Sequence, residues 1–131
     1  MPWTKARRDE NDVIVGVLPT AFELRTNEDY LSVTWIQHFG GDLCDQVTEA
    51  VRATRQSMTC SPKSCYGLSS SAEIRSVATK TAMKVRMLVE PTVENPAHVA
   101  VRQLDFSSFL LRQYLASDAF TSFVRNSDIP P

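Results

Sequence analysis

The segment Lys84–Leu104 (KVRMLVEPTVENPAHVAVRQL) constrains the fold more than any other part of the chain. Apolar residues alternate with polar or small residues at both of its ends, which indicates two strands that each have one buried and one wetter face. The apolar positions are Val85, Met87, Val89, Ala97, Val99 and Val101. Pro91 and Pro96 lie between the two sets, and proline lacks the amide donor that a helix needs. The segment therefore predicts two strands joined by an extended loop.

Three further strands are predicted upstream of this segment. Val13–Leu18 is apolar throughout, which is typical of a central strand covered on both faces. In Tyr30–Trp35 the apolar residues alternate with Ser32 and Thr34, and the β-branched and aromatic content favours a strand. Cys65–Ser70 is the third candidate, a short strand.

Capping residues and apolar spacing predict helices between these strands. The first covers Asp42–Met58, where Asp42 is a suitable N-cap and apolar residues recur at helical spacing. The second begins after Ser70 or Ser71 and runs through Ala82. Both helices are expected to pack on the sheet.

The C-terminal region predicts a third helix. Asp105 or Ser107 caps its start, and Ser117–Asp118 permits a break before a second helical piece that extends to Arg125. The whole order of elements predicts an α+β fold: a single mixed or antiparallel sheet of four to five strands with about three helices packed mainly on one face. We assign residues 1–11 to a flexible N-terminal segment and residues 12–131 to a single α+β domain.

Composition excludes several classes of function. The chain has 131 residues, 43% of them hydrophobic, which suits one globular domain. Its 14 Lys and Arg residues are scattered and balanced by 15 Asp and Glu residues, so we do not expect nucleic-acid binding. No apolar run approaches the ~20 residues of a membrane-spanning helix, and the N-terminus is not a secretory signal. We therefore expect a cytoplasmic protein without membrane attachment.

The cysteines predict neither a disulfide framework nor a metal site. Cys44, Cys60 and Cys65 are odd in number, and without an export signal they are expected to be reduced. A structural zinc site needs four Cys or His ligands, usually as two close pairs. The two histidines, His38 and His98, are far apart in sequence, so we expect no metal and no cofactor.

Two short motifs resemble a known group of proteins. Leu31-Ser32-Val33 and Asn95-Pro96-Ala97-His98 are similar to an LSV strand and an NPAH turn entering a strand in small, mostly uncharacterised bacterial proteins. The resemblance covers about a tenth of the chain. It implies a compact bacterial cytosolic protein, and it supplies no activity, cofactor or catalytic residue.

His98 is the residue that most suggests a polar site. Asn95 and Pro96 fix the backbone at the start of its strand, and a histidine held in this way can be a general base or a contact residue. Its structural alternative is a hydrogen bond from the imidazole to a neighbouring carbonyl. One interpretation of the chain is therefore a small enzyme or nucleotide-binding protein with a pocket near His98, Arg102, Asn95 and the helix start at Ser69–Ser71.

The C-terminal helix favours a different interpretation. Its apolar residues extend beyond half of the helix circumference, whereas a helix resting on a sheet needs a stripe of little more than ~100°. Aromatic anchors are enriched at protein interfaces. We expect Leu111 and Leu115, or Phe120 and Phe123, to be exposed in the isolated chain and to bind a partner. This predicts a non-catalytic accessory module that binds a larger bacterial protein or self-associates through this helix. The alternative, that the second helical piece folds back and both apolar ridges meet the core, remains open.

Overall fold

The structure is a computed structural model that describes residues 6–131. The strands are β1 (Ala6–Arg8), β2 (Ile14–Val17), β3 (Leu31–Thr34), β4 (Cys65–Leu68), β5 (Arg86–Val89), β6 (His98–Arg102) and β7 (Ser122–Arg125). The helices are α1 (Leu43–Ser57), α2 (Ser71–Lys80) and α3 (Phe109–Tyr114), with short helical turns η2 (Pro19–Phe22), η3 (Ile36–His38), η4 (Leu115–Ala119) and η5 (Asn126–Asp128). The α+β class predicted from the sequence is confirmed.

The strands form three small antiparallel sheets, with the orders β1-β2, β3-β6-β5 and β4-β7. The prediction of a single sheet of four to five strands is wrong. Two segments that were not predicted as strands, Ala6–Arg8 and Ser122–Arg125, are strands in the structure. Ala6–Arg8 pairs with β2 and Ser122–Arg125 pairs with β4, and neither β2 nor β4 is part of the sheet around β6.

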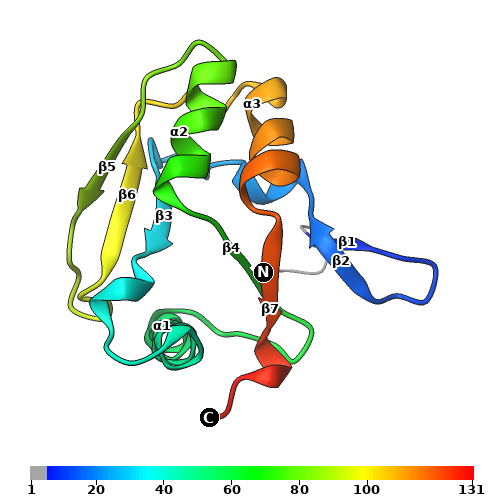
Figure 1. The fold of residues 1–131 in the computed structure, drawn as a ribbon, viewed down its shortest axis with the longest axis vertical. Coiled ribbons are helices and arrows are strands. Elements are labelled where there is room, and N and C mark those ends of the chain that lie inside the picture. The colour runs from blue at the N-terminus through cyan, green and yellow to red at the C-terminus, as the bar shows by residue number, and fades with distance from the viewer. Residues whose placement is uncertain (1–5) are drawn as a thin grey trace.

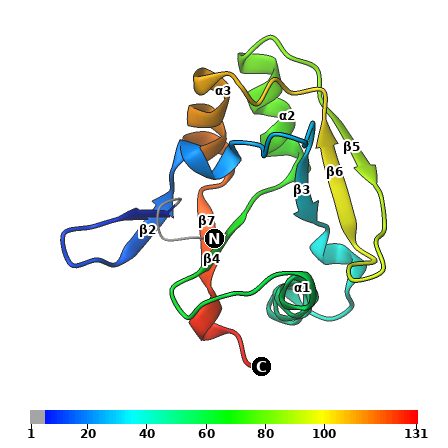
Figure 2. The ribbon, with the colours of Figure 1, turned by 180° about the vertical axis from the view of Figure 1, so that it is seen from behind.

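The helices lie at opposite ends of the molecule (Figures 1 and 2). In Figure 1, α2 and α3 lie side by side at the top, whereas α1 is seen end-on at the bottom, beyond the lower ends of β4 and β7. The three helices therefore do not share one face of one sheet. None of the helices within residues 6–131 combines the length and the apolarity needed to cross a membrane.

The starts of α1 and α2 follow the predicted capping residues, whereas α3 is capped by Ser108 and the prediction of Asp105 or Ser107 as its cap is wrong. Asp42 caps α1 by accepting a hydrogen bond from the Asp45 amide at 2.9 Å, and the Asp45 carboxylate accepts one from the Asp42 amide. Ser70 caps α2 in the same way, through the Glu73 amide at 3.1 Å. These side chains satisfy amide groups that have no partner inside the helix. Both predicted helix starts are confirmed.

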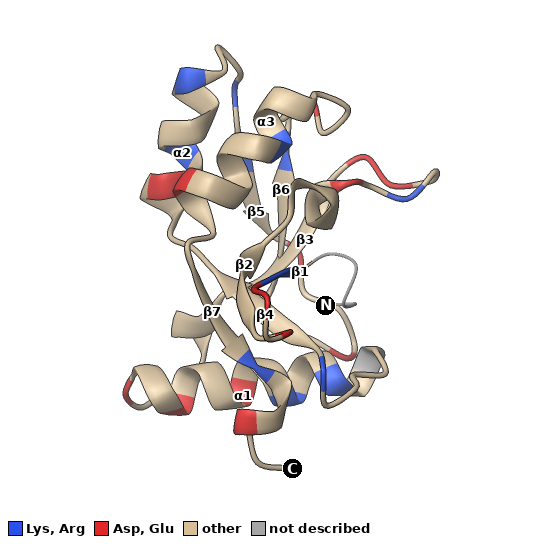
Figure 3. Ribbon diagram, turned by 90° about the vertical axis from the view of Figure 1, so that its right-hand side faces the viewer, with Lys and Arg blue, Asp and Glu red and all other residues tan. Residues whose placement is uncertain are grey.

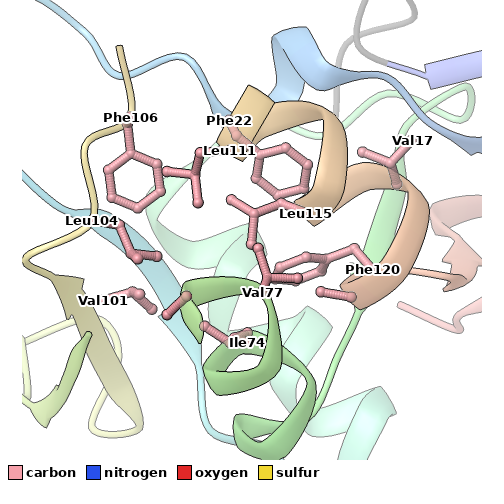
Figure 4. Close-up of a cluster of buried hydrophobic side chains, with 12 residues drawn as sticks. Val17, Phe22, Ile74, Val77, Val101, Leu104, Phe106, Leu111, Leu115 and Phe120 are labelled. Carbon is pink, nitrogen blue, oxygen red and sulfur yellow. The ribbon is translucent and has the colours of Figure 1, made fainter. Parts of the chain in front are cut away.

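The main core lies between α2, α3 and the inner face of the β3-β6-β5 sheet (Figure 4). Leu111 and Leu115 are 0% and 1% exposed and stand next to Val77 of α2. The rings of Phe22 and Phe120 lie 5.1 Å apart in a tilted arrangement, which is favourable for two aromatic rings. The most apolar side chains of α3 and of the turn that follows it therefore hold α3 against the core.

The end of α3 widens into a π-turn, which changes the direction of the chain. The Phe120 amide donates to the Leu115 carbonyl at 2.8 Å, five residues back, so one residue more than usual is accommodated. Ala119 and Phe120 are both buried as a result. The predicted second helical piece up to Arg125 is wrong, because Ser122–Arg125 leaves this turn extended and pairs with β4.

The N-terminal hairpin also departs from the prediction. Val13 and Val15 are 42% and 41% exposed, so the strand is not covered on both faces as its apolar sequence indicated. Ile14, in contrast, is buried with Ala6 and Cys65 in a second, small cluster. The two-stranded sheet thus buries one face only.

Candidate functional site

The outer face of the β3-β6-β5 sheet carries the polar residues singled out in the sequence. Strand alternation turns Val99 and Val101 inward, so that His98 and Arg102 project from the opposite face. Thr34 lies opposite His98 in the ladder, and Ser32 lies opposite Ala100. The predicted orientation of β6 is therefore confirmed.

His98 forms hydrogen bonds with both of its ring nitrogens. Nδ1 lies 2.8 Å from the Glu90 carbonyl oxygen, which can only accept, so Nδ1 donates. Nε2 lies 3.1 Å from Ser32 Oγ and is then the acceptor of the hydroxyl proton. This is the order of a nucleophile, a base and a group that orients the base. It also fits the structural role predicted for this histidine.

Arg102 extends across the same face and joins three side chains. Its guanidinium forms two hydrogen bonds to the Glu90 carboxylate, at 2.9 and 3.0 Å, and lies 4.4 Å from the centre of the Tyr30 ring. It also contacts Asp29 at 3.4 Å. Arg102 is opposite Arg86 in the ladder, so its side chain must run over Ala100 to reach Glu90. Ala100, on the same face, is 0% exposed. The hydrogen bonds from Arg102 hold the pKa of Glu90 below its usual range.

Asn95 is buried in the loop that leads into β6 and fixes that loop. Its side-chain amide donates to Thr34 Oγ1 at 2.9 Å, and its Oδ1 accepts from the Ala97 amide at 3.0 Å. The Asn95 side chain is thus engaged in loop contacts rather than directed at the His98 and Arg102 side chains.

Two open hollows of the described chain lie away from the residues of the predicted pocket. Each has a volume of about 490 Å³, and neither is lined by His98, Arg102, Asn95 or Ser69–Ser71. Ser70 instead caps α2, and its hydroxyl donates to Glu73 of the same turn. The structure places His98 and Arg102 on the same outer face of the β3-β6-β5 sheet.

The residues predicted to bind a partner are mostly inside the protein. Leu111, Leu115 and Phe120 are buried in the main core, and Phe123 is half-buried against the second cluster. The expectation that the Leu111 and Leu115 ridge is exposed in the isolated chain is wrong. Leu111, Leu115 and Ala119 recur every four residues, and this spacing is the signal that points to a core-facing stripe.

The exposed apolar side chains of α3 are the two that precede this stripe. Phe109 and Leu110 are 62% and 53% exposed. The Phe109 ring lies 5.7 Å from the guanidinium carbon of Arg112, which lines one of the two hollows. Phe109 thus lies against a residue that lines an open hollow, although neither Phe109 nor Leu110 lines the hollow itself.

Acidic side chains outnumber basic ones in the lining of that hollow. Four carboxylates and two guanidiniums line it, and they belong to Glu23, Glu28, Asp29, Asp105, Arg25 and Arg112. Arg112 pairs with Glu23 at 2.6 Å, and Figure 3 shows the acidic and basic segments on the loop that leads into β3. The four carboxylates therefore outnumber the two guanidiniums in the lining of this hollow.

The second hollow lies at the end of α1 and is lined by Arg55, Gln56, Met58, Thr59 and Cys60. Beside it, Asn126 accepts hydrogen bonds from Arg55 and from the Tyr66 hydroxyl, the latter at 2.7 Å. Burial is the main reason that the pKa of Tyr66 is raised above its usual value. This network is a long-range feature that local sequence patterns do not indicate.

Metal ligation finds no support in the described part of the chain. No three His, Cys, Asp or Glu side chains of residues 6–131 gather closely enough to hold an ion. Comparisons with protein-family models, with curated proteins and with solved structures found no match to this chain.

Proposed function

We propose that this protein is a non-catalytic interaction module that binds a protein partner through the first turn of α3 and the acidic hollow beside it. The observation that carries the proposal is the pair Phe109 and Leu110, each more than half exposed. The Phe109 ring lies against Arg112, which lines a hollow with more carboxylates than guanidiniums. Exposed aromatic and aliphatic anchors beside a polar rim are characteristic of protein interfaces.

The chemistry of the surface defines the partner. A segment that inserts an apolar side chain next to Phe109 would bring its neighbouring residues over Glu28 and Asp105. Lysine or arginine at those neighbouring positions would complement the carboxylates, and acidic residues would be repelled. The expected partner is therefore a protein segment in which apolar and basic residues are interleaved.

Synthetic peptides test this proposal. A peptide of interleaved Phe, Leu, Lys and Arg is titrated into the isotope-labelled protein, and amide chemical shifts are followed. We expect the shifts to concentrate on α3 and on the loop that lines the hollow, and we expect binding to weaken as salt is raised. A peptide with Glu in place of each basic residue should not bind.

Matched variants locate the surface. Replacing Phe109 and Leu110 by Ser should abolish peptide binding without unfolding the protein, and Glu28→Lys should weaken it. Val93→Ser is the control, because Val93 is 100% exposed and lies in the β5–β6 loop. Binding that survives the Phe109 and Leu110 substitutions, or that is lost equally in Val93→Ser, would refute the proposal.

A second candidate function rests on the contact between Ser32 and His98. The Ser32 hydroxyl lies 3.1 Å from Nε2, and the Glu90 carbonyl orients the ring, which is the arrangement of a serine nucleophile with its base. A small hydrolytic enzyme would use Ser32 in this way. Hydrolysis of an activated ester that disappears in both Ser32→Ala and His98→Asn would support this candidate over the interaction module.

A further inference from the structure

Strand β3 has an open edge. It is an outer strand of its sheet, and within residues 6–131 it pairs with β6 alone. The Trp35 amide donates to the Ala97 carbonyl at 2.9 Å, so these two residues form a hydrogen-bonded pair at the end of the ladder. Because such pairs alternate with open ones, the N–H and C=O groups of Ser32 and Thr34 point away from β6.

This edge carries none of the features that normally block strand pairing. Outer strands of soluble proteins usually carry charges, prolines or bulges. Leu31–Trp35 has no charged residue and no proline, and its register with β6 is continuous. The other outer strand of the sheet, β5, begins with Arg86 and is followed by Pro91.

The end of β3 also exposes a large aromatic side chain. By strand alternation, Trp35 shares the inner side of the sheet with Leu31 and Val33, both of which pack against the main core. Trp35 is nevertheless 45% exposed. The edge therefore offers two backbone donors, two backbone acceptors and an uncovered apolar side chain.

We propose that β3 pairs with β3 of a second copy of this chain, antiparallel and about a two-fold axis at Val33. In this register Ser32 of each copy exchanges two hydrogen bonds with Thr34 of the other. Trp35 of each copy then lies opposite Leu31 of the other and is covered by it. The two three-stranded sheets become one sheet of six strands.

Charge favours a second copy of this chain as the partner of β3, and it favours the register centred on Val33. The neutral segment Leu31–Trp35 meets only its own neutral copy, so no like charges face each other. A register centred on Ser32 would also keep the inner faces aligned, but it would place Trp35 opposite Asp29. Of these two registers, the Val33-centred one is therefore the one that pairs apolar with apolar residues along the inner side of the edge. This surface is separate from the Phe109 and Leu110 surface, so either proposal can fail alone.

Light scattering on the purified chain, over a range of concentrations, tests the dimer. Ser32→Pro removes one outward N–H and the Ser32 hydroxyl but no backbone hydrogen bond to β6, and proline is tolerated at such edge positions. We expect the wild type to dimerise and Ser32→Pro to be monomeric, with a red shift of Trp35 fluorescence in a Trp3→Phe background. A wild type that stays monomeric, or a dimer that persists in Ser32→Pro, would overturn the proposal.

Two controls separate the edge from side-chain effects. Ser32→Ala loses the same hydroxyl but keeps the amide, and it should remain dimeric. Val89→Pro removes an outward amide from β5, the opposite edge, and should also remain dimeric. If either control became monomeric while still folded, pairing through the β3 edge would be refuted.

A cross-link keeps the proposal testable should Ser32→Pro fail to fold. Opposed residues of an open antiparallel pair are about 4.5 Å apart at Cα, within the range that a disulfide spans. Val33→Cys, in a background with Cys44 and Cys60 replaced by Ser, should therefore form a covalent dimer on mild oxidation. Absence of the cross-link, or equal cross-linking of Val89→Cys, would rule out the β3 pairing proposed.

Discussion

Arg55 of α1 holds Asn126 of the C-terminal segment through two hydrogen bonds to the same oxygen. Nε and Nη2 of Arg55 lie 3.0 and 2.8 Å from Asn126 Oδ1, although the residues are 71 positions apart in sequence. The same guanidinium also donates to the carbonyls of Asn126, Ile129 and Pro130. One side chain thus fixes the end of the chain against α1.

Removal of the Asn126 side chain should destabilise the fold. Asn126 is 8% exposed, and its loss would leave the Arg55 guanidinium and the Tyr66 hydroxyl short of an acceptor. We expect Asn126→Ala to lower the free energy of unfolding by about 1–3 kcal/mol, measured by denaturant titration. Arg52→Ala, which breaks an exposed pair with Glu49 on the same helix, is the control and should change little. Equal stability of the two variants would contradict this role of Asn126.

Neighbouring leucines of α3 should respond in opposite ways to truncation. Leu111 is 0% exposed and Leu110 is 53% exposed. Leu111→Ala would leave a cavity in the core and should cost about 2–5 kcal/mol of stability. Leu110→Ala should cost little, so thermal melting of the two variants side by side checks which face of α3 is buried. A folded Leu111→Ala variant with an unchanged melting temperature would show that the core assignment is wrong.

Gly41 should tolerate substitution far less well than Gly40. Gly41 has a φ of +97°, and an added Cβ would lie 2.6 Å from the Asp45 carboxylate that completes the capping box. We expect Gly41→Ala to destabilise the protein by about 1–2 kcal/mol or more. Gly40→Ala meets no atom within 4 Å and should be close to neutral. Denaturant unfolding compares the two, and a smaller effect at Gly41 than at Gly40 would contradict the prediction.

The contact between Glu90 and Arg102 should make stability depend on pH in the acid range. Its hydrogen bonds with Arg102 lower the pKa of Glu90 from the usual 4.5, so the folded state favours the carboxylate more than the unfolded state does. The stabilisation is complete above about pH 4.5, the pKa of Glu90 in the unfolded state. It is lost as the pH falls through the lower pKa that Glu90 has in the folded state. The wild type should therefore have a higher melting temperature than Glu90→Gln at neutral pH. This difference in melting temperature should disappear at acid pH.

Glu94→Gln is the matched control for this pH profile, because Glu94 is an exposed carboxylate in the same loop. Its melting temperature should follow that of the wild type across the whole titration. A difference between wild type and Glu90→Gln that stays constant with pH would show that the Glu90 charge does not contribute.

Local sequence signals determined most of the secondary structure. The strand alternation in Lys84–Leu104 predicted β5 and β6, and the capping residues Asp42 and Ser70 predicted the starts of α1 and α2. These features depend on residues within one turn or one strand, so the sequence carries them directly. The outward orientation of His98 and Arg102 followed from the same alternation.

Tertiary structure decided which strands pair and which helix face is buried. Ser122–Arg125 had apolar residues suited to either a helix or a strand, and pairing with Cys65–Leu68, far away in sequence, made it β7. The same long-range packing buried Leu111 and Leu115 and left Phe109 and Leu110 exposed. Such outcomes depend on contacts between distant segments, whose free energies are absent from any local pattern. For the same reason the Arg55 contact with Asn126 and the acidic hollow beside α3 became apparent only in the folded chain.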